Sequence, residues 1–428
     1  MNLDLHLEGA WHPAGSVELL VEGQRSRRGR VSLNYEADYA LAHLGARDHR
    51  ALTVHAPVDL GLRTPPHWPS FLIDLLPQGA ARKRLERIAD GELTEWDLLQ
   101  QGVINPVGNI RIRPRDPAEP PQHPGFELRE MIARGDAFID YANERGATVA
   151  GATDTQGDAP KFWVVEDEQG RWHPDHGNLA VAVRRHLLLK FPVPEAGKNA
   201  EVILRHEAAY QRVAAAIGLR VTDSLPEFNG GALLIPRFDR RCIGGTQVRL
   251  GVESLYSVAG VLDSTDAPLR HHEALLALAE FLTDFDTEIL EYVRRDLLNI
   301  ALGNRDNHGR NTAILKDTDG TLRLAPLYDF GPSFLDARAI VRVIHWDGED
   351  SRGTDWNRVL ENLATHFEEA DARVVDWRAV AGAMHEFGRT LQRLPAVMVE
   401  SAVDAVIIEQ RRGEIEQLSR ALSAIRRL

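Results

Sequence analysis

The residues best suited to chemistry lie between Asn304 and Phe330. Asp306 is followed five residues later by Asn311, and a second carboxylate, Asp329, opens an Asp-Phe-Gly triplet. In enzymes that transfer phosphoryl groups, an Asp at the first position accepts the proton of the attacking hydroxyl, and the Asn and the later Asp hold Mg²⁺. The spacing therefore predicts Asp306 as a general base, with Asn311 and Asp329 as metal ligands.

The link between these two parts is expected to fold back as a hairpin. Residues 312–315 and 321–324 have the pattern of short strands, and residues 316–320 have that of a turn. Asp, Asn and Gly are common in turns, so an ordinary loop that caps a helix is the alternative interpretation. The order Gly-Asn-x-Asp-x-His-x-x-Asn, hairpin, Leu-Ala-Pro-Leu-Tyr-Asp-Phe favours the catalytic one.

A loop of small polar residues upstream is a candidate for binding phosphates. Residues 151–161 include Thr155, Gly157 and Lys161 and lead into an apolar strand. Backbone amides and a Lys side chain in such a loop can approach phosphate oxygens. Most Gly/Thr/Asp-rich loops are ordinary turns, but this one precedes the catalytic segment in the order that kinases use.

Further candidates for nucleotide binding lie between the loop and the catalytic segment. Lys190 ends an apolar strand, and Glu207 lies in the helix that follows, so the pair matches the Lys and Glu that position nucleotide phosphates in kinases. A surface Lys and a solvated Glu are the alternative. Three more residues are predicted to contact the nucleotide: Phe238, Asp239 and His308.

Composition restricts the class of protein. The chain has 428 residues, 43% of them apolar and 26% charged, which indicates two or three globular lobes. Its single cysteine, Cys242, excludes an internal disulfide and a cysteine-based zinc site. The sequence shows no apolar run of membrane-spanning length and no secretion signal, so we expect a cytoplasmic protein. A net charge of −13 argues against direct binding of nucleic acid.

The pattern of apolar residues predicts a β-rich first part and a helical last part. The expected domains are 1–115, then a proline-rich linker with a β-rich lobe at 116–240, then a helical lobe at 241–428 that contains the catalytic segment 302–330. Periodicity predicts helices over 126–145, 275–285, 290–302, 377–391 and 407–422.

With these motifs in place, the chain resembles the HipA-like kinases, bacterial serine/threonine kinases known mostly as toxins of toxin–antitoxin pairs. The resemblance covers residues 3–390 and rests on these features: the catalytic segment, the Gly-Asp-Ala-Pro-Lys loop ending at Lys161, the Lys190 strand, His206-Glu207, and Arg237-Phe238-Asp239-Arg240. It implies an α+β, protein-kinase-like two-lobed fold, with a β-rich N-lobe and an all-helical C-lobe, preceded by a small β-rich N-terminal subdomain.

The resemblance also implies a function. It predicts a kinase that uses ATP and Mg²⁺ to phosphorylate Ser or Thr of a protein, such as an aminoacyl-tRNA synthetase or another translation factor. Such a protein would be a growth-arresting toxin associated with persistence, neutralised by a HipB-like DNA-binding antitoxin. A small-molecule kinase of the same fold and a catalytically silent nucleotide-binding module remain alternatives.

Two positions depart from the family pattern. Asp154 stands where the family often carries an autophosphorylated Ser, so autophosphorylation, if it occurs, is expected on Thr153 or Thr155. Arg310 replaces the Lys that often precedes the catalytic Asn, which keeps the positive charge.

Overall fold

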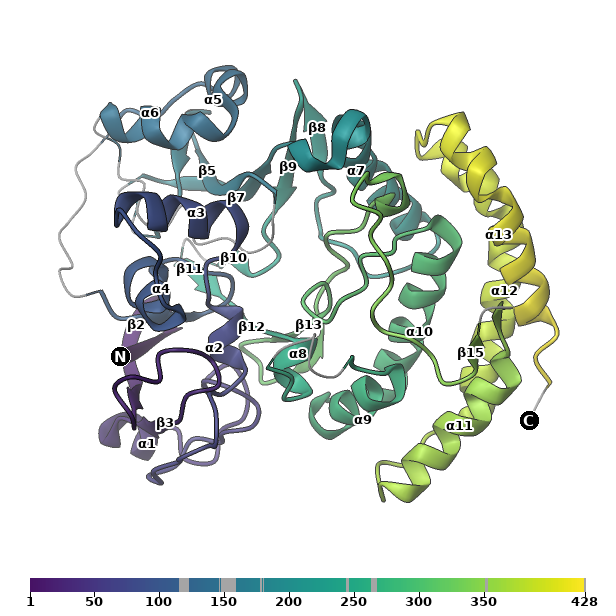
Figure 1. Cartoon of the computed structure of the whole chain (residues 1–428), viewed down its shortest axis with the longest axis horizontal. Helices are drawn as coiled ribbons and strands as arrows, with labels where there is room; N and C mark the ends of the chain where they lie inside the picture. Colours follow the sequence, from purple (N-terminus) through teal and green to yellow (C-terminus); the bar gives the residue numbers. More distant parts are fainter. Residues whose placement is uncertain are drawn as a thin grey trace. The chain divides into compact units, whose positions relative to one another are not determined.

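The chain folds into two compact units, each of which is built from three separate segments of the sequence. A computed structural model describes residues 1–114, 123–145, 147, 159–177, 179, 181–243, 246–262, 268–350 and 353–426 (Figure 1). The first unit comprises Met1–Val193, Pro226–Glu253 and Leu315–Gly320. The second unit comprises Pro194–Leu225, Ser254–Ile314 and Thr321–Leu428. The domain boundaries expected near residues 115 and 240 stay a prediction.

The first unit begins with a four-stranded antiparallel sheet in the order β3-β2-β1-β4. Its strands are β1 (Asn2–Leu7), β2 (Ala10–Leu19), β3 (Val31–Tyr35) and β4 (Ile110–Ile112). Leu3 and Leu5 are fully buried, as the alternation of apolar residues in β1 predicts. Four short helices lie between β3 and β4 in the sequence: α1 (Ala37–Ala42), α2 (Phe71–Asp74), α3 (Gly79–Ile88) and α4 (Glu95–Gly102).

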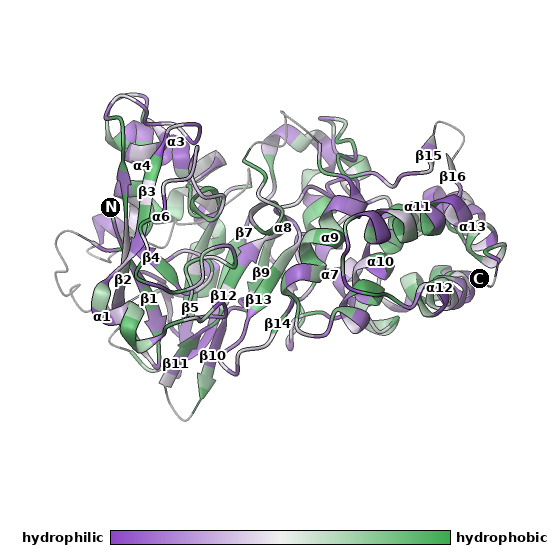
Figure 2. Ribbon diagram, turned by 90° about the horizontal axis from the view of Figure 1, so that it is seen from below, coloured by the Kyte–Doolittle hydropathy of each residue, from purple (hydrophilic) through white to green (hydrophobic). Residues whose placement is uncertain are grey.

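A five-stranded antiparallel sheet in the order β6-β5-β7-β9-β8 follows in the same unit. It contains β5 (Lys161–Asp167), β6 (Trp172–Pro174), β7 (Val183–Lys190), β8 (Glu227–Asn229) and β9 (Ala232–Pro236). Strand β9 is hydrophobic along its length (Figure 2). One face of the sheet contributes Phe162, Leu189 and Leu234 to a buried cluster with Phe138 and Met131. Because side chains alternate along a strand, the residues next to these in sequence lie on the opposite face.

The helical segment expected over residues 126–145 is interrupted in its middle. The structure has α5 (Leu128–Arg134), a 3₁₀ turn over Gly135–Ala137, and α6 (Phe138–Glu144). Gly135 has a φ of +57°, a left-handed conformation that interrupts the helix and that glycine adopts at little cost. The break turns α6 so that Phe138 and Ile139 reach the apolar face of the five-stranded sheet.

The hairpin expected within the catalytic segment is confirmed. Strands β13 (Ala313–Lys316) and β14 (Leu322–Leu324) are neighbours in a sheet of order β12-β13-β14, and the N–H of Gly320 donates to the carbonyl of Asp317 at 3.1 Å in the turn. The other strands of the chain are β10 (Arg240–Ile243), β11 (Thr246–Arg249), β12 (Gly251–Ser254), β15 (Glu349–Asp350) and β16 (Gly353–Thr354).

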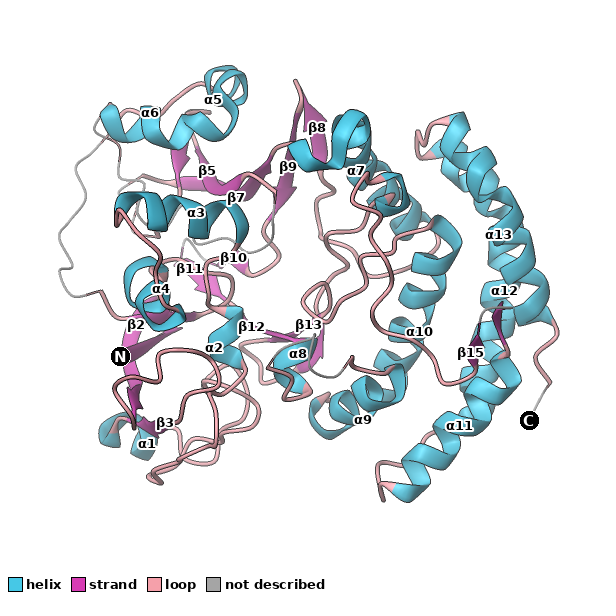
Figure 3. Ribbon diagram, viewed as in Figure 1, coloured by secondary structure: helices cyan, strands magenta, loops and turns pink. Residues whose placement is uncertain are grey.

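The second unit is mainly helical (Figure 3). Its helices are α7 (Ala200–Ala216), α8 (Leu255–Val258), α9 (His271–Phe281), α10 (Phe285–Leu302), α11 (Trp356–Glu369), α12 (Trp377–Glu400) and α13 (Ala405–Ser423). The helix expected over 275–285 is wrong at its end, because α9 stops at Phe281 and Asp284 caps α10, accepting from the N–H of Thr287 at 3.3 Å. The helix that ends at Leu302 is confirmed.

A buried ion pair holds the tip of the catalytic hairpin within the first unit. Lys316 is fully buried, and its Nζ donates to the carbonyl of Ala51 at 3.1 Å and lies 3.4 Å from Oε2 of Glu253. Glu253 in turn accepts from Thr53 Oγ1 at 2.6 Å and from the N–H of Val54 at 3.1 Å. Both charges are therefore paired and hydrogen-bonded, which is the condition for burying them without a large cost.

We expect Lys316→Met to lower the free energy of unfolding of the first unit by about 3–5 kcal/mol, because it leaves the Glu253 carboxylate buried without its cation. Urea denaturation measures the loss. The double variant Lys316→Met/Glu253→Gln should recover part of it, since no unpaired charge remains. The matched control is Lys83→Met at an exposed position, and equal stability of the Lys316 and Lys83 variants would contradict the expectation.

Candidate active site

The loop that carries Asp306 begins where α10 ends at Leu302. Gly303 follows with a φ of +71°, the left-handed conformation in which helices commonly end. A Cβ atom at this position would also lie 2.8 Å from Cδ1 of Phe334, so close packing independently requires a glycine. The helix thus stops sharply, and the chain turns into the loop within three residues.

The hydroxyl of Ser333 fixes the backbone of this loop. Ser333 Oγ accepts from the N–H groups of Arg305 at 2.6 Å and Asp306 at 3.2 Å, and donates to Oδ1 of Asn304 at 3.1 Å. Ser333 and Asn304 are both buried. No sequence pattern reveals this role, because Ser333 lies 27 residues beyond Asp306 and carries no motif of its own.

Three predicted site residues lie together in the loop. The side-chain amide of Asn311 donates from Nδ2 to the carbonyl of Asp306 at 2.8 Å, and the N–H of Asn311 donates to the carbonyl of His308 at 2.9 Å. Nε2 of His308 lies 3.4 Å from Oδ1 of Asp306, and both side chains are 36% exposed. Because Nδ2 of Asn311 is used internally, its Oδ1 is the atom available as an oxygen ligand.

The Asp-Phe-Gly triplet adopts a strained turn against α7. Asp329 has a φ of +49°, which costs free energy for a residue with a side chain. Phe330 is buried and packs on Tyr210 with ring centroids 5.4 Å apart. A Cβ at Gly331 would lie 2.9 Å from Cγ of Glu207, so Glu207 is placed directly beside the triplet.

A hydrogen bond joins the Asp329 turn to the Asp306 loop. The hydroxyl of Tyr328 donates to the carbonyl of Arg310 at 2.6 Å. Tyr328 directly precedes Asp329, and Arg310 directly precedes Asn311. The bond therefore ties together the two stretches that carry the predicted metal ligands.

Helix α7 contacts the catalytic segment at two places, Leu302 and Leu327. The hydroxyl of Tyr210 donates to the carbonyl of Leu302 at 3.0 Å, and Nε2 of Gln211 donates to the carbonyl of Leu327 at 2.9 Å. All of these residues belong to the second unit. One helix thus sets the start of the loop and the start of the Asp329 turn.

A small pocket of about 30 Å³, partly open to solvent, lies beside Asp306 and has a buried carboxylate in its wall. Asp296 of α10 accepts from Nη1 and Nη2 of Arg342 at 3.2 and 3.0 Å and from Nε1 of Trp346 at 2.7 Å. His271 stacks on Trp346 with ring centroids 3.9 Å apart. Burial alone would raise the pKa of Asp296, but the charges and hydrogen bonds of Arg342 and His271 together hold the pKa well below its usual value.

Two lysines predicted to bind phosphates lie opposite each other in the first unit. Lys161 and Lys190 are cross-strand partners of β5 and β7, so their side chains leave the same face of the sheet. That face is opposite the one covered by α5 and α6, because Phe162 and Leu189 point into the apolar cluster. Two like charges at this spacing concentrate positive potential, which suits the binding of an anion.

Asp239, in the same unit, is buried and hydrogen-bonded by two arginines and a backbone amide. Its Oδ1 accepts from Nε of Arg237 at 2.9 Å, and its Oδ2 accepts from Arg237, from Nη1 of Arg240 at 2.6 Å and from the N–H of Gly108 at 2.7 Å. Burial tends to raise the pKa of Asp239, and the two arginines together lower it well below its usual value. The nucleotide contact of Asp239 and of the half-buried Phe238 stays a prediction.

Other predicted nucleotide contacts are untested by this geometry. Thr155 and Gly157 lie outside the described residues, as do Thr153 and Asp154. Lys190 belongs to the first unit and Glu207 to the second, so their pairing also stays a prediction.

Comparison with known proteins identifies the family. The model of the HipA-like C-terminal domain matches residues 149–404. The chain belongs to this family. Among curated relatives from Sinorhizobium fredii (strain NBRC 101917 / NGR234), it is 33% identical to the protein named "Putative kinase Y4mE" over 131 residues, 29% of this chain and 31% of that protein. It is 22% identical to "Putative kinase Y4dM" over 334 residues, 72% of this chain and 73% of that protein.

A solved structure confirms the fold class. HipA of Shewanella oneidensis MR-1, described as a toxin–antitoxin complex with HipB and its operator DNA, matches with a TM-score of 0.67 at 16% identity over 99% of this chain and 97% of that one. The HipA-like chain therefore has the predicted α+β, protein-kinase-like fold with a β-rich lobe and a helical lobe. Within the described residues, no helix combines the length and apolar composition needed to cross a membrane.

We expect Asp296→Asn to destabilise the helical unit by about 3 kcal/mol at neutral pH, because it leaves the Arg342 charge buried without its partner. The folded-state pKa of Asp296 lies below its unfolded value, so its contribution is complete above about pH 4 and is lost as the pH falls further. Denaturation curves at several pH values should show the difference between native chain and variant shrinking below about pH 4. Asp223→Asn at an exposed position is the control, and a pH-independent difference would contradict the assignment.

Proposed function

We propose that this chain is an ATP- and Mg²⁺-dependent serine/threonine protein kinase of the HipA type that acts as a growth-arresting toxin. The observation that carries the proposal is the fixed arrangement of the catalytic segment. Asn311 is bonded to the backbone of Asp306, and the Tyr328–Arg310 bond joins that loop to the turn of Asp329. Membership of the HipA-like family supports it.

The residues of this segment fit a magnesium ion. Oδ1 of Asn311 and the carboxylate of Asp329 are hard oxygen ligands, the kind that Mg²⁺ prefers. Bound there, Mg²⁺ would offset the negative charge of the nucleotide phosphates. The strained turn at Asp329 supports this role, because such strain is retained where the direction of a side chain matters.

Asp306 would act as the base. Its carboxylate is accessible and lines the pocket, so it can accept a hydrogen bond from an acceptor hydroxyl and take its proton. Its backbone is already held by Ser333, and little ordering remains to be done when the acceptor arrives. His308, with Nε2 at 3.4 Å from the carboxylate, is close enough to contact a phosphate or to orient Asp306.

Lysines of the first unit would hold the nucleotide. Lys161 and Lys190 supply two cations on one sheet face for the phosphates, and Glu207 would position Lys190 as in other kinases. The backbone of Phe238 would meet the adenine edge, since Pro236 has no N–H and the N–H of Arg237 donates to the carbonyl of His186.

The solved relative suggests the partner. Because that HipA is described with HipB and operator DNA, we infer a HipB-like antitoxin for this chain, with DNA contacted through the antitoxin. A net charge of −13 agrees with this division of roles. The acceptor would be a cytoplasmic protein, such as an aminoacyl-tRNA synthetase or another translation factor.

Asp306→Asn should lower phosphoryl transfer by about 100-fold or more and leave ATP affinity almost unchanged, because a general base acts in the chemical step. Radiolabel transfer, calorimetry with ATP and Mg²⁺, and phosphoproteomics of cells expressing either form measure the two effects. Asp223→Asn serves as the control. Normal transfer by the Asp306 variant would refute the assignment.

The same assays separate the alternatives. Phosphorylation of a small molecule without any modified protein would replace the proposal by a small-molecule kinase. ATP binding by the native chain without transfer to any acceptor would replace it by a silent nucleotide-binding module.

Asp329→Asn should weaken nucleotide binding in the presence of Mg²⁺ by about tenfold or more, because the metal loses a charged oxygen ligand. Binding without Mg²⁺ should change little. A magnesium titration of nucleotide affinity makes the comparison. If native chain and variant follow the same titration curve, Asp329 does not bind the metal.

A further inference from the structure

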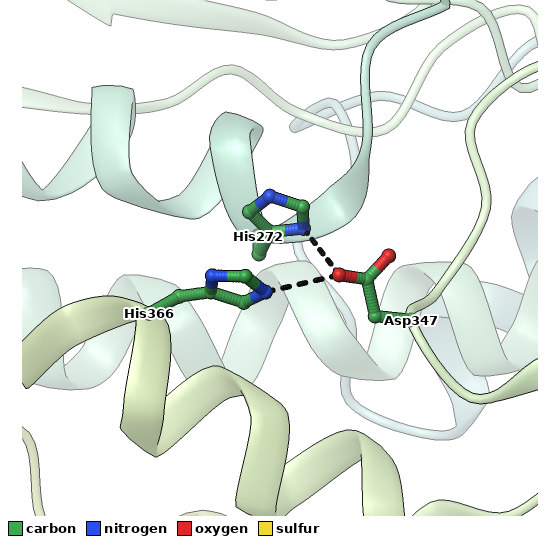
Figure 4. Close-up of side chains that lie close together, drawn as sticks. All are labelled: His272, Asp347 and His366. Atoms are coloured by element: carbon green, nitrogen blue, oxygen red, sulfur yellow. Dashed lines mark hydrogen bonds and ion pairs between the residues drawn. The ribbon is translucent and has the colours of Figure 1, made fainter. Parts of the chain in front are cut away.

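Three side chains with metal-binding atoms converge at a place that the catalytic segment does not use. His272 lies at the start of α9, Asp347 in the chain before β15, and His366 in α11 (Figure 4). Nδ1 of His272 is 3.1 Å and Nε2 of His366 is 3.0 Å from Oδ2 of Asp347. All three ligand atoms lie within 4.8 Å of one another, and all three residues belong to the second unit.

The two imidazoles lie against each other and share one carboxylate oxygen. Their rings stack with centroids 3.8 Å apart and an interplanar angle of 11°, and both direct a nitrogen to the same carboxylate oxygen (Figure 4). Nδ1 of His272 is buried and, among the described residues, has no hydrogen-bond partner of acceptable geometry. A buried ring nitrogen without a hydrogen bond costs free energy unless something else binds it.

A further contact fixes the backbone of Asp347. Nδ2 of Asn362 donates to the backbone carbonyl of Asp347 at 3.0 Å. Asn362 lies one turn before His366 on α11, so both project from the same side of that helix. The contact fixes the backbone of Asp347 relative to the helix that carries His366.

We propose that His272 Nδ1, His366 Nε2 and Asp347 Oδ2 form a binding site for a divalent transition metal, with Zn²⁺ the best fit. Two imidazoles and one carboxylate suit zinc and not magnesium, which prefers oxygen ligands. Ligands at about 2.0–2.1 Å from a tetrahedral ion lie roughly 3.4 Å apart. The observed separations of 3.0 and 3.1 Å need a small expansion, and one ring must turn out of the parallel stack so that both nitrogens point at the ion. A water molecule would complete the coordination.

This site would stiffen the wall of the pocket beside Asp306. His271 and Trp346, the neighbours in sequence of His272 and Asp347, stack on each other, and Trp346 donates to Asp296 in that wall. An ion bound by the adjacent residues would lock α9 to the segment that carries Trp346. The site is therefore structural, and its existence does not depend on kinase activity.

The test uses the full chain, stripped of metal with a chelator and then dialysed. Calorimetry with Zn²⁺ and visible absorption with Co²⁺, both in excess Mg²⁺ to occupy oxygen-ligand sites, should show one equivalent bound per chain. Zn²⁺ should also raise the melting temperature by about 2 °C or more. No saturable binding of Zn²⁺ or Co²⁺ would overturn the proposal and leave a hydrogen-bonded His-Asp-His trio.

Variants locate the ion. His366→Asn and Asp347→Asn should each weaken binding by more than about tenfold, beyond the effect of losing an outer contact, whereas His385→Asn on α12 should bind as the native chain does. Melting curves without metal check that each variant folds. His366→Cys supplies a different zinc ligand and should restore binding that His366→Asn loses. Equal affinity of the native chain and the His366 and Asp347 variants would place the ion elsewhere and refute the site.

Discussion

The position of Asp306 depends on one buried hydroxyl. Ser333 accepts from two consecutive backbone N–H groups of the loop and donates to Asn304, which is itself bonded through its amide to Asn299 of α10 at 2.9 Å. Each bond is worth about 0.5–1.5 kcal/mol, but their shared atom makes them act as one constraint. Through it, a rigid helix determines where the carboxylate of a loop residue lies.

Helix α7 has the corresponding role for the second carboxylate. The backbone of Asp329 is held at a positive φ, which costs about 1–3 kcal/mol. Packing of Phe330 on Tyr210 and the close approach of Gly331 to Glu207 offset that cost. Strain and packing are therefore coupled, and the turn is stable only while α7 is in place.

The sequence was sufficient where the contacts are local. The five-residue spacing singled out Asp306 and Asn311, which lie in contact in the structure, and apolar spacing predicted the end of α10 at Leu302. Ser333 meets the loop only in the folded chain, and no pattern reveals it. The contact of Asp296 with Trp346 spans 50 residues and was missed for the same reason. Errors at 126–145 and 275–285 arose because apolar periodicity continues through the helix break at Gly135 and the helix start at Asp284.

The buried ions of the first unit limit how this protein can be recombined with its relatives. The family match covers residues 149–404, yet Asp239 and Arg240 within it depend on the backbone of Gly108, which lies outside it. Lys316 depends likewise on the carbonyl of Ala51. In a chimera made by exchanging only residues 149–404, the buried charged side chains of one protein would have to bond to the N-terminal backbone of another. Natural or engineered exchange should therefore succeed only when the N-terminal residues are inherited with the segment whose buried charged groups they hydrogen-bond.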